Sequence, residues 1–316
     1  NTFHYSHFED IEQLLYLKEK GDKKITVCLP TENSEKTIGH IIRVIKDELI
    51  KKFSLVDEIV VVDAHSTDRT RLIVEGLDVN FFYDNQILSG LPRHFKGKGE
   101  SIWKSLAVST GDIIVWMNTD ILNFAHHFVY GLVGPLLLYD TLHLVKGFYR
   151  HPSQDNTTSY EKESDPVTEI LTRPFLNLFY PELTGIVHPL LGKCAGRREI
   201  LESVPFFTGY GMELGLLIDI YRKWGEMVIA QVDLGWRFRQ NMPQEVLSKI
   251  SFGILQVMFN RLHDDGKIEL IGELSEQYHK FISRGEGFSL QTDIIKEWKR
   301  PPMKDIIRVK QGINVE

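Results

Sequence analysis

A run of five apolar residues that ends abruptly in polar residues is the feature that most constrains how this chain can fold. The segment reads GDIIVWMNTD, from Gly111 to Asp120, and its apolar part is Ile113 to Met117. An unbroken apolar run of this length is typical of a strand buried on both faces, as inside a parallel sheet. The sequence therefore predicts an α/β fold with a central strand at this position.

The polar end of this strand carries a carboxylate at Asp120 and an amide at Asn118. Ligands of open α/β sheets bind at the carboxyl ends of the strands. A carboxylate there can hold a divalent cation against a diphosphate, because Mg²⁺ keeps several waters and is fixed by one or two carboxylates plus phosphates. We therefore expect Asp120 to be a metal ligand, with Asn118 contributing a neutral oxygen at best.

Strand-like and helix-like segments alternate along the first half of the chain, which is the pattern of βαβ units. Further strands are expected at ITVCLP from Ile25, at VDEIVVVD from Val56 and at VNFFYD from Val79. The sheet is therefore expected to be mostly parallel. Asp63 ends the second of these strands and precedes a helix, which on its own is also typical of any strand–turn–helix joint.

Composition and charge exclude several classes of protein. The chain has 316 residues, of which 42% are hydrophobic, enough for one large domain or a domain with an appendage. A net charge of −6 provides no basic surface for nucleic acid. The most apolar stretch, from Phe128, is interrupted by glycine, proline and charged residues, so a buried helix and strand are expected and not a membrane span. Only Cys28 and Cys194 are cysteines, and with no signal-peptide pattern this favours a cytoplasmic location.

Two more charged positions allow both a structural and a functional interpretation. Lys98 lies in the loop KGKG, which is either a solvated basic turn or, because glycine lets the backbone approach closely, a phosphate contact without P-loop spacing. Glu213 precedes an apolar helical pattern and could simply place a favourable charge at the helix start. Their order in one chain, together with Pro30, Asp63 and Asp120, favours the functional interpretation.

The motifs, taken in order, resemble the retaining glucosyl- and mannosyl-3-phosphoglycerate synthases, which are nucleotide-diphospho-sugar glycosyltransferases of the GT-A fold. The resemblance runs from about Ile25 to Lys304. It rests on the segments VCLPTENSEKTI, DAHSTDRT, GKGESIWKSL, GDIIVWMNTDI, FVYGLVGPLL, LVKGFYR, PVTEILTRPFLNLFYPEL, HPLLGKCAGRREIL, PFFTGYGMELGLLID, IAQVDLG and RPPMK. A GT-A core, with a mostly parallel sheet, is therefore expected.

The chain is expected to divide into three parts. A helical lead-in would span 1–24, the GT-A domain 25–243, and a helical C-terminal region with an extended tail 244–316. The resemblance also implies a homodimer. The apolar run ISFGILQVMF, from Ile250, is expected to be the self-association surface.

The resemblance implies roles for individual residues around a nucleotide-diphospho-sugar donor and a small anionic or polyol acceptor. The nucleotide would be held by Pro30, Thr31, Glu32, Glu35, Asp63, Ser66, Lys98, Asn118 and Thr119. Asp120 would bind Mg²⁺ or Mn²⁺. Thr168 and Asn241 would face the phosphoglycerate acceptor. The expected catalytic set is Glu213, Asp120, Leu190 and Arg239, with Leu190 and Glu213 lining the donor sugar.

Four positions depart from the family pattern. The Asp-x-Asp motif of the family is Asn118-Thr119-Asp120 here, and a metal-ligating histidine aligns with Arg239. A family glutamate aligns with Lys193, and an acceptor-binding arginine aligns with Pro166. Arginine cannot ligate a metal, but its charged fork binds phosphate oxygens. We therefore expect Arg239 and Lys193 to offset part of the leaving-group charge, with reduced dependence on the metal.

Several alternatives stay open. A hexosyltransferase acting by front-face attack with retention is favoured, because no pair of carboxylates flanking the sugar is evident. The altered positions also fit a catalytically impaired member of the family that acts as a binding or scaffold subunit. A nucleotidyltransferase is disfavoured, since the loop at Pro30 is not glycine-rich. The sequence leaves open glucose or mannose, UDP or GDP, and 3-phosphoglycerate or another acceptor.

Overall fold

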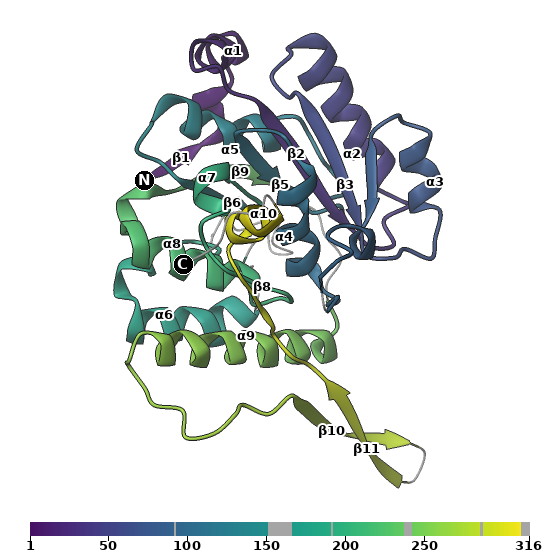
Figure 1. Ribbon diagram of the computed structural model, residues 1–316, viewed down its shortest axis with the longest axis vertical. Helices are drawn as coiled ribbons and strands as arrows, with labels where there is room; N and C mark the ends of the chain where they lie inside the picture. The colour runs from purple at the N-terminus through teal and green to yellow at the C-terminus, as the bar shows by residue number, and fades with distance from the viewer. Residues whose placement is uncertain (92, 151–165, 191, 237–241, 285–286, 311–316) are drawn as a thin grey trace, which may run out of the picture.

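An eight-stranded sheet lies at the centre of the computed structural model, which describes residues 1–91, 93–150, 166–190, 192–236, 242–284 and 287–310 (Figure 1). The strand order is β1-β9-β6-β7-β5-β2-β3-β4. The strands are β1 Thr2–His4, β2 Ile25–Thr31, β3 Glu58–Asp63, β4 Asn80–Tyr83, β5 Ile113–Trp116, β6 Leu144–Arg150, β7 Cys194–Arg197 and β9 Ile229–Trp236. Only β7 among them runs antiparallel to its neighbours, β5 and β6. The mostly parallel sheet predicted from the sequence is confirmed.

Helices cover both faces of the sheet (Figure 1). They are α1 Ile11–Lys20, α2 Ile38–Val44, α3 Thr70–Glu75, α4 Lys98–Val108, α5 His127–Leu138, α6 Arg173–Phe179, α7 Arg198–Leu201, α8 Met212–Trp224, α9 Gln244–Asp264 and α10 Met303–Lys310. A π-helix, Ile45–Lys52, continues α2, and another, Thr168–Thr172, precedes α6. Apolar side chains of α1, α2 and α5 pack on one face, and those of α4, α8 and α9 on the other.

Strand β5 is buried on both faces, as its apolar run predicts. Ile113 and Val115 join one apolar cluster, whereas Ile114 and Trp116 join the other. In the ladders, Trp116 lies opposite Cys28, and Asp63 lies opposite Thr31. The carboxyl ends of β2, β3 and β5 therefore lie side by side at one edge of the sheet.

The apolar stretch that begins at Phe128 forms a buried helix and strand, as expected. It supplies most of α5 and the start of β6. Packing is close here: a Cβ added at Gly134 would lie 2.4 Å from the Phe8 ring. No helix within the described residue ranges is long and apolar enough to cross a membrane.

The two ends of the chain differ from what the sequence predicted. Residues 1–24 contain α1, but they begin with β1, which pairs with β9 and extends the sheet. A strand of three residues is too short to be recognised from its sequence pattern, because it forms only by pairing with a strand that is distant in the chain. At the other end, α10 occupies part of the segment expected to be an extended tail.

The C-terminal region begins with the predicted helix, α9, and then continues as β-strands that the sequence did not predict. Two long strands, β10 Gln277–Arg284 and β11 Gly287–Ile294, form a hairpin that projects from the body (Figure 1). A short strand, β12 Lys299–Arg300, then pairs with β8 Phe206–Phe207. The chain thus returns from the hairpin to the main domain.

Candidate functional site

A cavity of about 530 Å³ lies where the carboxyl ends of β2, β3 and β5 meet. It is lined by Pro30, Thr31, Glu32, Ser34, Ala64, His65, Asp84, Lys96, Gly97, Lys98, Ser101, Asn118, Thr119, Asp120, Tyr210 and Met242. Seven of these lining residues, namely Pro30, Thr31, Glu32, Lys98, Asn118, Thr119 and Asp120, are candidate site residues from the sequence. The parallel strand ends therefore bring together residues that are far apart in the chain.

Asp63 holds the loops after β2 and β3 together from behind the cavity wall. Its buried carboxylate accepts hydrogen bonds from the Ser66 backbone N–H at 2.7 Å and from the Ser66 hydroxyl at 2.6 Å. The Ser66 hydroxyl oxygen in turn accepts from the Asn33 N–H at 2.7 Å. Glu35 closes the same junction by accepting from the Arg69 N–H at 3.1 Å. Asp63, Ser66 and Glu35 shape the loops and do not themselves line the cavity.

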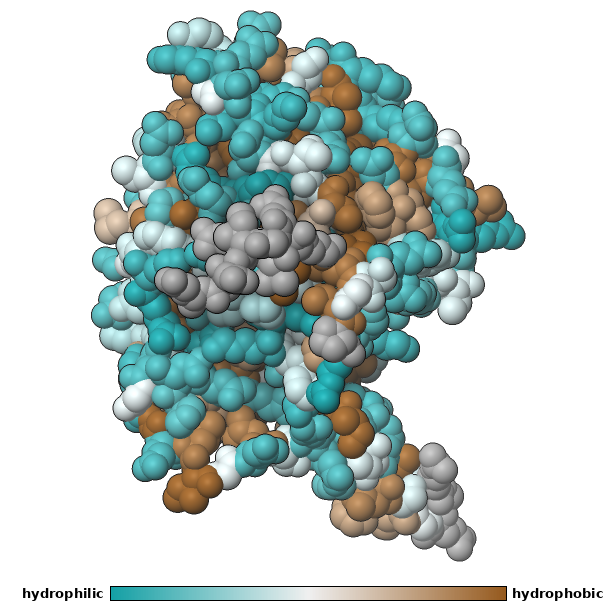
Figure 2. Space-filling view, viewed as in Figure 1, coloured by the Kyte–Doolittle hydropathy of each residue, from teal (hydrophilic) through white to brown (hydrophobic). Residues whose placement is uncertain are grey.

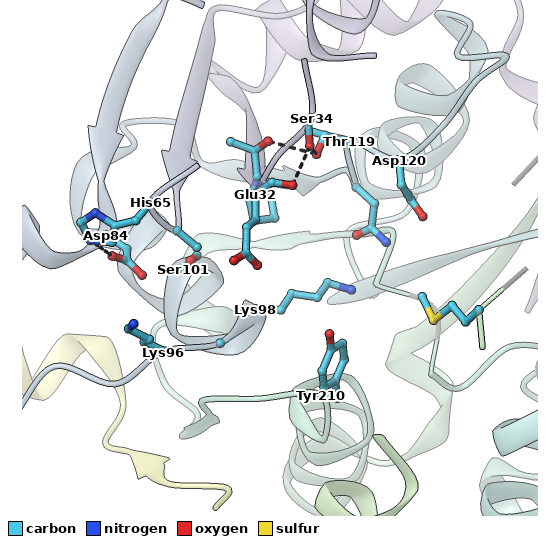
Figure 3. Close-up of a pocket in the computed structure, with 16 residues that line it drawn as sticks. Glu32, Ser34, His65, Asp84, Lys96, Lys98, Ser101, Thr119, Asp120 and Tyr210 are labelled. Atoms are coloured by element: carbon cyan, nitrogen blue, oxygen red, sulfur yellow. Dashed lines mark hydrogen bonds and ion pairs between the residues drawn. The ribbon is translucent and has the colours of Figure 1, made fainter. Parts of the chain in front are cut away.

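Thr119 ties the end of β5 to the loop that follows β2. Its hydroxyl lies 2.7 Å from the Ser34 hydroxyl and 3.2 Å from the Thr31 hydroxyl (Figure 3). The Thr37 hydroxyl donates to the Thr119 carbonyl. Because Thr119 is buried and fixed in this way, its two neighbours, Asn118 and Asp120, are held at the cavity wall.

The oxygens of Asn118 and Asp120 are the candidate metal ligands. Asp120 is exposed to solvent, and the buried Asn118 side-chain oxygen has no hydrogen-bond partner among the described residues. No group of three or more His, Cys, Asp or Glu side chains able to hold a metal occurs within those residues. One carboxylate and one amide fit a hard cation that completes its shell with waters and phosphate oxygens.

Lys98 lines the cavity and forms an ion pair with Glu213, which lies behind it. Lys98 begins α4 and Glu213 lies in the first turn of α8, so two helix starts converge here. A Cβ added at Gly192 would lie 2.1 Å from Lys98 Nζ and 2.6 Å from Glu213 Oε1. A side chain at this position would therefore force the end of Lys98 or Glu213 to shift. Lys98 itself reaches between Glu32 and Tyr210 (Figure 3).

A histidine–aspartate pair at the far end of the cavity was not among the sequence candidates. His65 Nε2 lies 3.2 Å from Asp84 Oδ1 (Figure 3). The His65 ring also stacks on Tyr83. Burial raises the pKa of Asp84, against the opposing charges of Lys104 and His65. The position of Asp84 directly after the third strand was the one signal that pointed to it. Tyr210 and Met242 were also missed.

Some expected site residues do not line this cavity. Thr168 is 1% exposed and lies in the helical segment before α6. Leu190 is half-buried and does not line the cavity. Glu213 does not line it either, but it forms an ion pair with Lys98, which does. Arg239 and Asn241 lie outside the described residues.

The two arginines nearest the expected acceptor segment already contact carboxylates. Arg173 donates to both Glu169 oxygens and to the Val187 carbonyl. Arg150 donates to Asp233 through two nitrogens. Each guanidinium charge is therefore offset within the chain.

The sheet, the cavity at its carboxyl edge, Lys96 and Lys98, and the carboxylate after β5 are the features expected of a GT-A glycosyltransferase, and the match to known proteins establishes that class. Residues 26–204 match the family described as glycosyl transferase family 2. The chain is 45% identical to the glucosyl-3-phosphoglycerate synthase of Petrotoga mobilis, over 100% of this chain and 97% of that protein.

Solved structures agree with this match. The mannosyl-3-phosphoglycerate synthase of Rubrobacter xylanophilus superposes with a TM-score of 0.88 at 33% identity, covering 96% of this chain and 95% of the other. The Mycobacterium tuberculosis glucosyl-3-phosphoglycerate synthase with Mn²⁺, UDP and glucosyl-3-phosphoglycerate gives 0.81 at 35% identity, covering 94% and 95%. The chain belongs to the glucosyl-3-phosphoglycerate synthase family and is a hexosyltransferase. The family, fold class and enzyme class predicted from the sequence are confirmed.

Proposed function

We propose that this protein transfers glucose, with retention, from UDP-glucose to 3-phosphoglycerate. The observation that carries the proposal is the cavity at the ends of β2, β3 and β5, in a chain 45% identical over its full length to a glucosyl-3-phosphoglycerate synthase. Glucose is favoured over mannose because the sequence relatives at 45% and 37% identity are glucosyl-3-phosphoglycerate synthases, whereas the matched mannosyl enzyme is 33% identical. The two buried, unpaired cysteines are in line with a cytoplasmic location, which we also propose.

In this proposal the nucleoside lies against the loops after β2 and β3. Pro30, Thr31 and Glu32 would contact it directly, whereas Asp63, Ser66 and Glu35 would hold those loops in shape. Lys98 and the oxygens at 118–120 would face the diphosphate. A fixed ammonium near the diphosphate stabilises the negative charge that grows on the leaving group.

Mg²⁺ or Mn²⁺ is the cofactor we infer, and solved relatives were obtained with Mn²⁺ or Mg²⁺. When bound, such a cation would neutralise charge on the diphosphate. Asp120 and the Asn118 side-chain oxygen would hold it. With one carboxylate in place of two, we expect weaker metal binding than a two-carboxylate site provides, and Lys193 and Arg239 would offset the remaining charge.

Glu213 and Leu190 are the residues we assign to the donor sugar. The carboxylate of Glu213 is 4% exposed and is paired with Lys98, so it would orient the sugar rather than attack it. The leaving phosphate would then accept the proton of the acceptor hydroxyl. Thr168 and Asn241 remain proposed acceptor contacts, and Pro166 offers no donor where the family pattern has arginine. A polyol acceptor is therefore the competing possibility.

Binding and turnover test the proposal directly. Calorimetric titration should show binding of UDP and UDP-glucose, and product should form from UDP-glucose and 3-phosphoglycerate in a reaction that a chelator slows. GDP-mannose and the acceptors glycerate and glycerol are the matched comparisons. Absence of heat with every nucleotide would reject the transferase proposal. Nucleotide binding without turnover on any acceptor would instead indicate an impaired enzyme.

We also propose that the β10–β11 hairpin forms the contact of a homodimer. The apolar run from Ile250, the surface expected from the sequence, packs inward: Ile250, Ile254 and Met258 belong to the protein's own core. The hairpin instead exposes apolar side chains (Figure 2). They are Phe281 (69% exposed), Phe288 (79%), Leu290 (53%) and Ile294 (68%). An isolated two-stranded hairpin is marginally stable in water, so a covering surface is expected.

Light scattering will check the dimer. Phe281 lies opposite Leu290, and Phe288 is two residues from Leu290, so these side chains share one face of the hairpin. Replacing Phe281 and Phe288 by serine should convert the dimer to a monomer at micromolar concentration. Gln291→Ser, on the other face, is the control. A wild-type monomer, or a double variant that stays dimeric, would contradict this assignment.

A further inference from the structure

The chain that returns from the hairpin runs along the segment that carries Tyr210. We call residues 295–300 the C-terminal strap; it leads from β11 to β12 (Figure 1). The Thr208 N–H donates to the Trp298 carbonyl at 2.9 Å, and the Trp298 N–H donates to the Thr208 hydroxyl at 3.1 Å. Lys299 then pairs with Phe207 across β12 and β8. The strap is thus hydrogen-bonded along the whole approach to the turn at 209–211.

Glu297 of the strap fills a cradle made by glycines. One carboxylate oxygen accepts from the Gly209 N–H at 2.8 Å and the other accepts from the Gly211 N–H at 3.1 Å. A Cβ added at Gly209 would lie 2.2 Å from Glu297 Oε1, and one at Gly253 would lie 2.9 Å from the same oxygen. Burial raises the pKa of Glu297, whereas the hydrogen bonds from Gly211 and Gly209 lower it.

The turn held by Glu297 contributes to two walls of the cavity. Tyr210 lies between the two glycines and lines the cavity (Figure 3). Just before it, the Thr208 carbonyl accepts from the Glu100 N–H at 2.9 Å in the first turn of α4. A Cβ at Gly97 would lie 2.5 Å from the same carbonyl. A shift of this turn would therefore move Tyr210 and disturb the helix start that carries Lys98.

Glu297 is itself held from behind by α9. Its backbone N–H donates to the Gln256 side-chain oxygen at 2.9 Å. The Gln256 amide donates to the Ser275 and Ile295 carbonyls, both at 2.9 Å. Two segments that flank the hairpin are thereby fixed to one helix. The position of the carboxylate is set by the fold and does not depend on a bound ligand.

We propose that Glu297 is a positioning residue for donor binding: its carboxylate holds the 209–211 turn, and through it Tyr210 and the first turn of α4, at the cavity wall. The inference depends on the proposed function, in which this cavity takes the nucleotide sugar. Glu297 does not line the cavity, so it acts through the turn and not by contact with the substrate.

Glu297→Gln tests the proposal with nearly the same shape. The amide can accept from one glycine N–H but presents its own NH₂ to the other. Loss of one charge-assisted hydrogen bond corresponds to about a tenfold effect or more. We expect about a tenfold rise in the KM for UDP-glucose and in the Kd for UDP, with kcat changed much less. Glu297→Asp, which keeps the charge, should recover part of the affinity. Glu276→Gln is the control, since the Glu276 side chain is 40% exposed and pairs with Lys296.

A double-mutant cycle separates positioning from general stability. If Glu297 acts through Tyr210, Glu297→Gln should weaken UDP binding far less in a Tyr210→Ala background than in the wild type. Additive effects both in this cycle and in the matching cycle with Lys98→Met would overturn the proposal, as would unchanged UDP binding by a folded Glu297→Gln variant. Amide exchange of the unmodified protein without nucleotide is a further check: fast exchange at Gly209 and Gly211 would also overturn it. Wild-type protein that binds no UDP would reject the proposed function instead.

Discussion

Asp120→Asn is expected to lower kcat for hexosyl transfer by about two to three orders of magnitude, the size of effect seen when one group that stabilises transition-state charge is removed. Asp120 is the only acidic residue in the segment 117–126 between β5 and α5, and the buried Thr119 fixes its position. Without it, the protein itself would offer a metal only the neutral oxygen of Asn118. Asp140→Asn is the matched control, because the Asp140 side chain is fully exposed and does not line the cavity. A wild-type kcat in the Asp120→Asn variant would show that Asp120 has no role in hexosyl transfer.

Position 118, two residues before Asp120, allows the opposite test, in which a carboxylate is added to the site. Asn118→Asp, alone or with Arg239→His, should lower the Mn²⁺ concentration for half-maximal activity, because oxygen and imidazole ligands are added to the site. The unsatisfied Asn118 oxygen already lies at the cavity wall, so the new carboxylate needs no rearrangement. Tight Mn²⁺ binding by the unmodified protein, with no gain from either change, would refute the inferred weakening of the metal site.

Gly192→Ala should reduce kcat/KM for UDP-glucose by about a hundredfold, the cost of displacing a site group by roughly an ångström. The added methyl would lie 2.1 Å from Lys98 Nζ, so the Lys98–Glu213 pair must separate or shift. Because Glu213 is buried, the separated carboxylate would lose its main charged partner. Steady-state kinetics with UDP-glucose and 3-phosphoglycerate will measure the loss.

The control for this variant is Gly185→Ala, where an added Cβ would meet nothing within 4 Å. Its kinetics should match the wild type. Lys98→Met should reproduce most of the Gly192→Ala defect, since both remove the ammonium from its place in the cavity lining. Normal activity in a folded Gly192→Ala variant would mean that the pair has no part in catalysis.

That the residues after β2, β3 and β5 would lie together was largely predictable, for a simple geometric reason. Strand ends in a parallel sheet lie at one edge, so Thr31, Asp63 and Asp120 could be placed together once three strands had been recognised. The structural role of each of these residues was not predictable. Asp63 turned out to hold a loop junction through Ser66, a role that depends on atoms from another loop, including the Asn33 N–H.

Residues that the sequence did not reveal act through long-range contacts. His65 adopts a left-handed backbone conformation with a φ of 66° and meets Asp84 only because β3 and β4 are neighbours. Glu297 reaches Gly209 and Gly211 only because the chain returns from the hairpin to the main domain. Neither pairing leaves a periodic signal in the sequence.

The sequence by itself determined the fold class, the order of the central strands along the chain and the family, because apolar runs and strand-end motifs are local properties of the chain. Only the tertiary structure decided which charged groups meet: Lys98 with Glu213, and Glu297 with the glycine turn. It also turned the apolar face of α9 inward and left the hairpin exposed. The physical reason is that burial and ion pairing depend on distances between remote segments, which only the packed chain defines.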